Sequence, residues 1–209
     1  MKKYVLAMTG ASGSPFGIRV LEELAKTAEV HLVVSSNSFS IIRDETGLDW
    51  AENTESAVRE HCGSDTIFFY ENRQMEAPVA SGSFRTDGML VVPCSMKTLS
   101  GIAAGYAANL IERAADVTLK ERRPLLLSPR EMPFSALHLE NMLKLARLGV
   151  VIAPPVPAFY HLAGHLAGHP SGHTPGQKPA GLEEMVNFVA GKILDVFGVE
   201  HALFRRWGS

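Results

Sequence analysis

The sequence has few cysteines, little net charge and no long apolar run. Its two cysteines, Cys62 and Cys94, lack C-x-x-C spacing, so they predict neither a disulfide framework nor a zinc site and favour a reducing compartment. A formal charge of -2 over 209 residues gives no electrostatic footprint for nucleic acid. No apolar stretch approaches the roughly 18 residues that span a bilayer, and no signal-peptide pattern precedes the first apolar run. We therefore expect a cytoplasmic protein that binds neither nucleic acid nor a membrane.

The chain alternates short apolar runs with longer helical patterns. The runs include YVLAM, EVHLVVS, GMLVVP and PLLLS, and the helical patterns include SALHLENMLKLARLG and GLEEMVNFVAGKILDVFG. This alternation is typical of βαβ units around a parallel sheet, and the length suits one domain over residues 1–209. We predict a doubly wound, three-layer α/β fold of the Rossmann type, with a mostly parallel sheet. Ligands of such folds bind at the carboxyl ends of the strands.

The first apolar run leads into a glycine-rich turn, TGASGSPFG, that precedes a helical pattern. Strand, glycine loop and helix N-terminus together favour an anion site. The spacing is not G-x-G-x-x-G, and Ser35 and Ser36 follow the second strand where a dinucleotide site would show an acidic residue. A mononucleotide phosphate therefore fits better than a dinucleotide. The alternative is a tight turn without a ligand.

Two further segments offer polar groups after apolar runs. In CSMKTLSG, Ser95 and Thr98 are candidates either for capping a helix or for contacting a ligand. A helix predicted from about Asn109 carries Arg113 and Lys120 seven residues apart, on one face. Two cations on one face suit a phosphate. The alternative is that Lys120 offsets the helix dipole near the end of the helix and that Arg113 pairs with a neighbouring carboxylate.

Three more candidates follow the later strands. Arg130 and Glu131 come directly after PLLLS, where Glu131 is a candidate general acid or base and the alternative is a plain surface ion pair. Tyr160 ends PPVPAFYH, and its hydroxyl suits either an anion or a single structural hydrogen bond.

A histidine-rich near-repeat, HLAGHLAGHPSGHTPG, begins at His161. Four-residue spacing on a helix would stack the imidazoles as metal ligands, but the repeated glycines together with Pro170 and Pro175 oppose a continuous helix. We interpret residues 162–178 as a loop insertion and expect no metal site.

Taken together, MTGASG, CSMKTLSG, the terminal RRWG and the run from ERAADVTLKERRPLLLSPREMPF to PPVPAFYH resemble the flavin prenyltransferase (UbiX) family. The resemblance covers almost the whole chain except the insertion. It implies an enzyme that joins a dimethylallyl group from dimethylallyl phosphate to N5 and C6 of reduced FMN without a metal. The prenylated FMN would then serve a UbiD-type decarboxylase. A homo-oligomer, commonly a dodecamer, is also implied.

The resemblance also assigns residues. For FMN it implies contacts from Gly10, Ala11, Ser12, Ser35, Ser95, Met96, Lys97, Thr98 and Arg130. For the prenyl phosphate it implies Tyr160, Lys192, Arg113 and Lys120. The catalytic candidates are Glu131, Ser12, Glu45 and Lys120.

One departure from the family concerns Met75, which stands where some relatives carry a tryptophan that packs near the flavin. This difference affects the packing of the prenyl chain rather than the chemistry. Two alternatives to prenyl transfer remain at this point: an FMN-dependent cysteine decarboxylase and a module that only binds or carries FMN.

Overall fold

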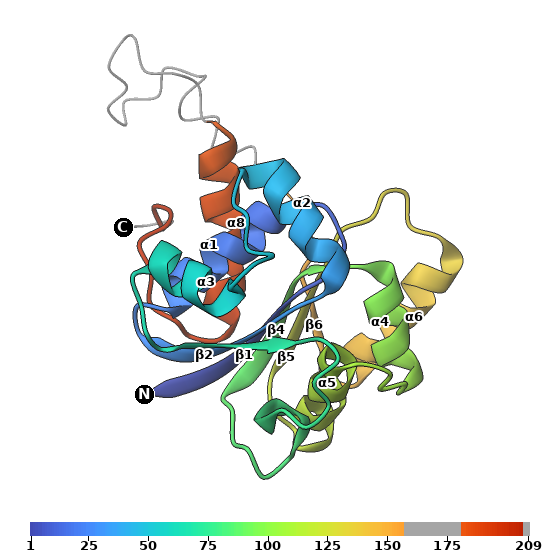
Figure 1. The fold of residues 1–209 in the computed structure, drawn as a ribbon. Coiled ribbons are helices and arrows are strands. Elements are labelled where there is room, and N and C mark those ends of the chain that lie inside the picture. The colour runs from blue at the N-terminus through green and yellow to red at the C-terminus, as the bar shows by residue number, and fades with distance from the viewer. Residues whose placement is uncertain (157–180, 207–209) are drawn as a thin grey trace, which may run out of the picture.

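The computed structural model describes residues 1–156 and 181–206, which form a parallel six-stranded sheet with helices on both faces (Figure 1). The strand order is β3-β2-β1-β4-β5-β6, and every pair of neighbours is parallel. The strands are β1 (Lys2–Met8), β2 (Ala28–Val34), β3 (Ile67–Glu71), β4 (Gly88–Cys94), β5 (Leu125–Pro129) and β6 (Val151–Ile152). The predicted doubly wound fold is confirmed.

Helices from separate parts of the chain cover the two faces. The first face packs against α1 (Ser14–Leu24), α2 (Ser36–Thr46), α3 (Thr54–Cys62) and α8 (Leu182–Val196). The second packs against the short η1 (Pro78–Ala80), α4 (Met96–Ala104), α5 (Leu110–Lys120) and α6 (Ala136–Arg147). Along β1, Leu6 belongs to the first core and Val5 and Ala7 to the second, as the two-residue period of a strand requires. The central strands are therefore apolar on both faces.

The close approach of α1 to β4 depends on a glycine. A Cβ atom built on Gly17 would clash with the carbonyl oxygen of Val92 and with the Met8 side chain. The third glycine of the first loop therefore serves helix–sheet packing, and this places the start of α1 next to the end of β4.

The order of the strands reverses at β1, whose neighbours are β2 and β4. Such a reversal opens a crevice at the carboxyl ends of the strands, and ligands of doubly wound folds bind there. The polar segments predicted for this edge follow β1, β2, β4 and β5 at that end. The fifth segment, PPVPAFYH, leaves the described residues after Val156.

Candidate active site

Three helices begin at the carboxyl edge of the sheet. They are α1 after the first glycine loop, α2 after β2, and α4 after β4. Helix N-termini present free N–H groups and the positive end of the helix dipole. Helices that begin at the same edge therefore favour the binding of an anion there. The Ser95 side chain caps α4 by accepting from the Thr98 N–H at 3.3 Å, whereas Ser35 at the start of α2 makes no side-chain cap.

The N-terminus of α1 is occupied by a carboxylate from the end of α2. Glu45 accepts hydrogen bonds from the N–H of Gly13 at 3.0 Å, the N–H of Ser14 at 2.8 Å and the hydroxyl of Ser14 at 2.7 Å. Partial burial acts to raise the pKa of Glu45, but these bonds and one from Ser12 outweigh it and lower the pKa. Glu45 is therefore a bound carboxylate beside Ser12, which the resemblance assigns to the flavin.

The lowered pKa gives Glu45 a predictable effect on stability. A carboxyl group whose pKa falls on folding stabilises the protein above its ordinary value of 4.5. That contribution is lost as the pH drops through the lower folded value. We expect Glu45→Gln to lower the melting temperature at neutral pH, and the gap to the parent to close as the pH falls below 4.5 and through the lowered folded pKa. Thermal unfolding across this range measures it. Glu60→Gln, at an exposed position of α3, is the control, and an equal gap at both ends of the range would contradict the assignment.

The loops after β1 and β4 are tied together by Thr9. Its hydroxyl donates to the carbonyl oxygen of Pro93 at 3.0 Å and accepts from the N–H of Ser95 at 2.7 Å. The hydroxyls of Ser95 and Thr98 lie 3.1 Å apart. Thr9 is buried, and sequence reasoning missed it, although a threonine directly after an apolar run and before the glycine loop was the available signal. Through these two hydrogen bonds, Thr9 fixes the positions of the two predicted FMN loops relative to each other.

The loop after β2 contributes hydroxyl groups at the same edge. Ser35 and Ser38 oxygens lie 2.8 Å apart, and Ser38 also donates to the carbonyl oxygen of Met8 at the end of β1. The structure thus brings together the predicted residues of three loops: Gly10, Ala11, Ser12, Ser35, Ser95, Met96, Lys97 and Thr98.

The loop after β5 adds Arg130 and Glu131. The Arg130 N–H donates to the carbonyl oxygen of Cys94 at 3.2 Å, which holds this loop against the end of β4. Within residues 1–156 and 181–206, the Arg130 guanidinium and the Lys97 ammonium make no hydrogen bond or ion pair, so both can contact an anion. Glu131 is exposed, and its carboxylate accepts from the Met132 N–H at 3.1 Å. The alternative interpretation of these two residues, a surface ion pair between Arg130 and Glu131, is wrong, because the described residues form no such pair.

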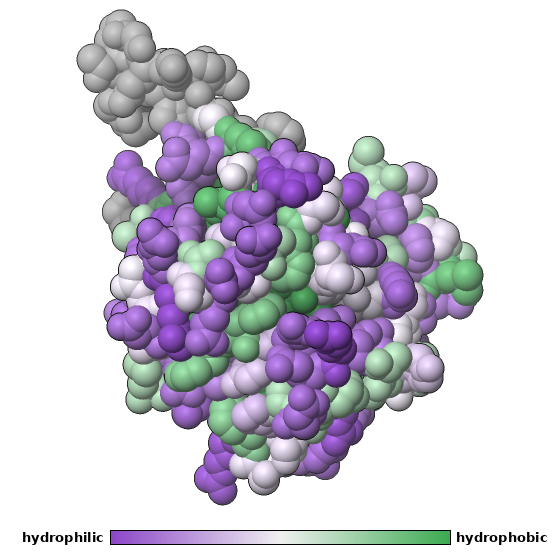
Figure 2. Space-filling view, viewed as in Figure 1, coloured by the Kyte–Doolittle hydropathy of each residue, from purple (hydrophilic) through white to green (hydrophobic). Residues whose placement is uncertain are grey.

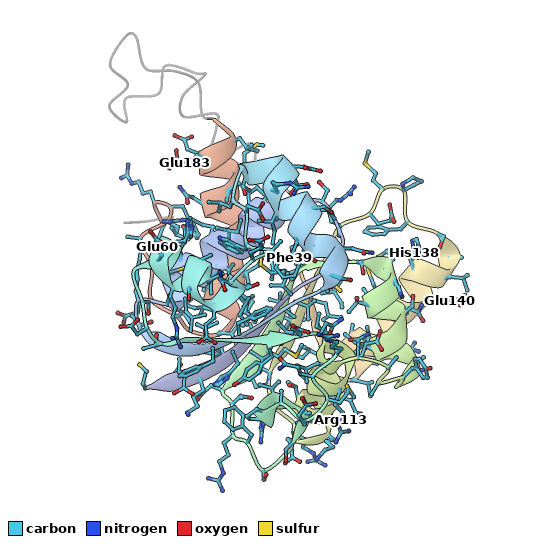
Figure 3. The ribbon with its side chains drawn as sticks, viewed as in Figure 1. Phe39, Glu60, Arg113, His138, Glu140 and Glu183 are labelled. Atoms are coloured by element: carbon cyan, nitrogen blue, oxygen red, sulfur yellow. The ribbon has the colours of Figure 1, made fainter. Side chains whose placement is uncertain are left out.

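A hollow of about 590 Å³ lies beside this edge, at the ends of β2 and β3. Its apolar wall includes Val34, Phe39 and Phe69, and Ser36 reaches it from the start of α2. Figure 3 shows Phe39 on α2, directed toward the sheet. Met75, the residue that differs from some relatives, also lines the hollow and is partly exposed. The volume is within the usual range for small-molecule pockets, and its aromatic and aliphatic lining suits a flat ring system.

The predicted phosphate cations on α5 lie elsewhere. Arg113 donates to the carbonyl oxygen of Ala80 at 3.1 Å and pairs with Asp116 at 2.6 Å. Figure 3 shows it on the face of the sheet opposite Phe39. Lys120 pairs with Glu121 at the far end of α5, near the amino end of β5. With about 3.3 Å per strand residue, the length of β5 alone separates Lys120 from Glu131 by about 13 Å.

The remaining predicted phosphate ligands are divided between described and undescribed parts of the chain. Lys192 lies exposed on α8, with its ammonium 3.8 Å from Asp195. Tyr160 and the histidine repeat lie outside the described residues. One described chain therefore assembles the predicted FMN residues but not the cations expected to bind the prenyl phosphate.

Neither a metal cluster nor a membrane-spanning helix is seen in the part of the chain that the structure describes. In residues 1–156 and 181–206, His, Cys, Asp and Glu form no group of three that could hold a metal ion. No helix of the same residues is both long and apolar enough to cross a bilayer.

Comparisons with known proteins agree with this geometry. The model of the Flavoprotein family matches residues 1–193. A "Flavin prenyltransferase UbiX" of Methanocaldococcus jannaschii is 45% identical over 207 residues, covering 99% of each chain. The structure of AnUbiX in complex with FMN and dimethylallyl pyrophosphate has a TM-score of 0.82 at 42% identity, covering 100% of this chain and 98% of that one. A dodecameric FMN-dependent UbiX-like decarboxylase from Escherichia coli O157:H7 has a TM-score of 0.81 at 44% identity, covering 99% and 100%.

The fold and the matched family model define the chain as a flavoprotein. Within that class, the near full-length identity shows that it belongs to the flavin prenyltransferase (UbiX) family. The resemblance found in its motifs is therefore confirmed.

Proposed function

We propose that this protein transfers a dimethylallyl group from dimethylallyl phosphate to N5 and C6 of reduced FMN, with no metal ion. One observation carries the proposal: the N-termini of α2 and α4 and a set of serines lie at the same sheet edge as a hollow of about 590 Å³ that has an apolar wall. A mononucleotide flavin needs an anion site for its single phosphate and an apolar space for its ring. Both are present, so the residues fit FMN.

The arrangement suggests which groups hold FMN. Ser35, Ser95 and Thr98 offer hydroxyls beside the starts of α2 and α4, where a phosphate is favoured by the helix dipoles. The backbone of Gly10 to Ser12 and the side chain of Arg130, which pairs with no residue in the described ranges, complete the contact set. Reduced FMN supplies the nucleophilic N5 and C6 atoms when bound.

The chemistry sets two tasks for the protein. Transfer breaks the allylic carbon–oxygen bond, and phosphate departs with the bonding electron pair. N5 loses its proton as the first bond forms. Ring closure then adds a proton to the prenyl double bond, joins C6 to the resulting cationic carbon and releases the C6 proton. We assign charge stabilisation to Arg113, Lys120, Lys192 and Tyr160, whose cations and hydroxyl can take the place of a metal on the departing phosphate. We assign proton transfer to Glu131, with Glu45 as the second candidate, because both carboxylates lie at the edge where FMN is expected.

Since Arg113 and Lys120 lie away from the FMN residues of their own chain, we propose that a neighbouring copy supplies them. The E. coli relative is dodecameric, which supports a homo-oligomer here. We further propose that the product serves a UbiD-type decarboxylase in the cytoplasm.

The decisive experiment is mass spectrometry of the flavin released after anaerobic incubation with reduced FMN and dimethylallyl phosphate. We expect the flavin mass to rise by the prenyl group, and the yield to persist when a chelator replaces magnesium, since protein cations carry the phosphate charge. FAD and NAD in place of FMN serve as controls and should give no adduct.

Other outcomes would contradict the proposal in distinct ways. Unchanged FMN together with carbon dioxide release from a cysteine-terminated peptide would indicate a cysteine decarboxylase. Tight FMN binding with neither reaction would indicate a carrier module. Activity that disappears with chelator and returns with magnesium would direct attention to the histidines that begin at His161.

A further inference from the structure

After α8 ends, the chain turns back and packs against that helix. Figure 1 shows this part of the chain beside α8, and we call residues 199–206 the C-terminal segment. The rings of His201 and Phe204 lie over Gly191 of α8, where a Cβ atom would clash with both. The Phe204 ring also lies 5.1 Å from the ring of Phe188 on α8. Gly191 therefore provides the space in which the C-terminal segment packs.

Asp195 of α8 is the main polar contact of the C-terminal segment. The Arg206 guanidinium donates to both carboxylate oxygens, from Nη2 to Oδ1 at 2.7 Å and from Nη1 to Oδ2 at 3.3 Å. The Nε2 atom of His201 lies 3.2 Å from Oδ1. The hydrogen bond from Arg206 is the largest cause of the lowered pKa of Asp195 and outweighs the opposing effect of partial burial. Asp195 is therefore a carboxylate held by two side chains of the C-terminal segment.

His201 fixes the position of that carboxylate from the buried side. Its side chain is fully buried, and its Nδ1 atom accepts a hydrogen bond from the N–H of Leu203 at 3.2 Å. A ring nitrogen that accepts a hydrogen bond carries no proton, so the neutral ring has its proton on Nε2 and donates to Asp195. The buried ring thus orients the carboxylate toward Arg206 at the surface.

Lys192 lies beside this cluster, one helical turn before Asp195. Its ammonium is 3.8 Å from Asp195 Oδ2, which is beyond hydrogen-bond distance, and its side chain is 59% exposed. Lysine and aspartate three residues apart on a helix can form a close ion pair. Here the carboxylate is already bound by the planar guanidinium of Arg206, which offers two parallel donors where an ammonium offers a single point charge.

The cluster suits a solvent-accessible anion. Lys192 and Arg206 are two cations around one carboxylate, so the cluster keeps a net positive charge. Figure 2 shows mainly hydrophilic side chains on the side of the molecule where α3 and the C-terminus lie in Figure 1. If Arg206 were absent, pairing of Lys192 with Asp195 would neutralise the cluster.

We propose that Arg206, by occupying Asp195, keeps the Lys192 ammonium free to bind the phosphate group of the prenyl donor. Arg206 is then a positioning residue, because it acts on the donor through Asp195 and Lys192. The proposal rests on the proposed function, in which Lys192 is one of the phosphate ligands. It makes Asp195 a competitor for Lys192 that Arg206 holds in check.

Steady-state prenyl transfer by the full chain, saturated with reduced FMN, tests the proposal. We expect Arg206→Met to raise the KM for dimethylallyl phosphate about tenfold and to leave kcat within a few-fold of the parent, because one charged contact to the bound phosphate is lost. Asp195→Asn should keep the parental KM, since no carboxylate then competes for Lys192. Arg206→Met/Asp195→Asn should return to the parental KM for the same reason.

A merely structural role of the ion pair predicts a different pattern. Asp195→Asn would then raise the KM as much as Arg206→Met does, and the double variant would be no better than either, so each of these results overturns the proposal. Lys26→Met is the matched control, because Lys26 also pairs with a carboxylate, that of Glu23 at 2.7 Å, but on α1. It should keep the parental KM. FMN binding shows that each variant is folded, and Arg206→Gln replaces Arg206→Met if the latter does not bind FMN.

A crystal structure of the Arg206→Met protein tests the ion pairing without reference to activity. The Lys192 ammonium should lie about 2.8 Å from the Asp195 carboxylate. A distance that stays beyond hydrogen-bond range overturns the proposal even if prenyl transfer is confirmed.

Binding of inorganic phosphate to the FMN-loaded protein, measured by calorimetry, decides the case in which the parent transfers no prenyl group and the proposed function fails. Binding about tenfold weaker in Arg206→Met would support the role of Arg206, and unchanged binding would overturn it.

Discussion

Glu131→Gln is expected to lower prenyl transfer by at least about a hundredfold while FMN binding persists. The substitution keeps the size of the side chain and its ability to accept the Met132 N–H, so the loop after β5 retains its local hydrogen bond. It removes proton exchange, which typically contributes 10²- to 10⁴-fold in rate when a positioned carboxyl group supplies it. Single-turnover formation of the adduct, started with reduced FMN already bound, measures the chemical step.

Glu60→Gln provides the matched control, because Glu60 is an exposed carboxylate on α3, which Figure 3 shows on the opposite side of the molecule from His138. It should leave the rate within a few-fold of the parent. If Glu131→Gln also keeps its rate within a few-fold of the parent, the proton-transfer role is assigned to Glu45 or to the released phosphate instead. Loss of FMN binding would instead assign Glu131 to the binding of FMN.

The fold could be predicted from the sequence because its signals are local. Strands buried on both faces have to be continuous apolar runs, and YVLAM and GMLVVP are such runs. The predicted fold also predicted where the FMN loops lie, because parallel strands place their carboxyl ends, and the loops that follow them, at one edge of the sheet. Even so, the three glycines of the first loop do not serve one purpose: Gly17 permits the approach of α1 to β4, and the sequence pattern alone assigned it to the loop.

Contacts between distant residues could not be predicted in this way. Glu45 reaches the N–H of Gly13 across 32 positions of the chain, and nothing in SNSFSIIRDET shows which of its side chains will turn toward α1. Lys120 shares a helix face with Arg113, as the spacing predicted, yet the length of α5 carries it toward the opposite edge of the sheet. Helical periodicity specifies a face but not the depth at which a residue meets the sheet.

That separation leads to the last prediction. Lys120→Met is expected to lower prenyl transfer by about a hundredfold or more, because a cation that stabilises the departing phosphate is lost. If Lys120 acts on the FMN of a neighbouring copy, chains with Lys120→Met and chains with Glu131→Gln should restore activity when they assemble together. Each kind of chain still carries the residue that the other lacks. Random assembly of equal amounts yields about a quarter of the sites with both residues intact, and hence about a quarter of parental activity.

The comparison that decides this is between co-expressed and separately assembled variants. Chains co-expressed with two different affinity tags and purified through both tags form mixed oligomers, and their rate should exceed that of either variant alone by well over tenfold. Chains purified separately and mixed under conditions that prevent subunit exchange should stay inactive. The double variant Lys120→Met/Glu131→Gln, co-expressed with parent chains, controls for simple dilution. Absence of recovery in verified mixed oligomers would place Lys120 and Glu131 in one chain's site, or would remove Lys120 from the reaction.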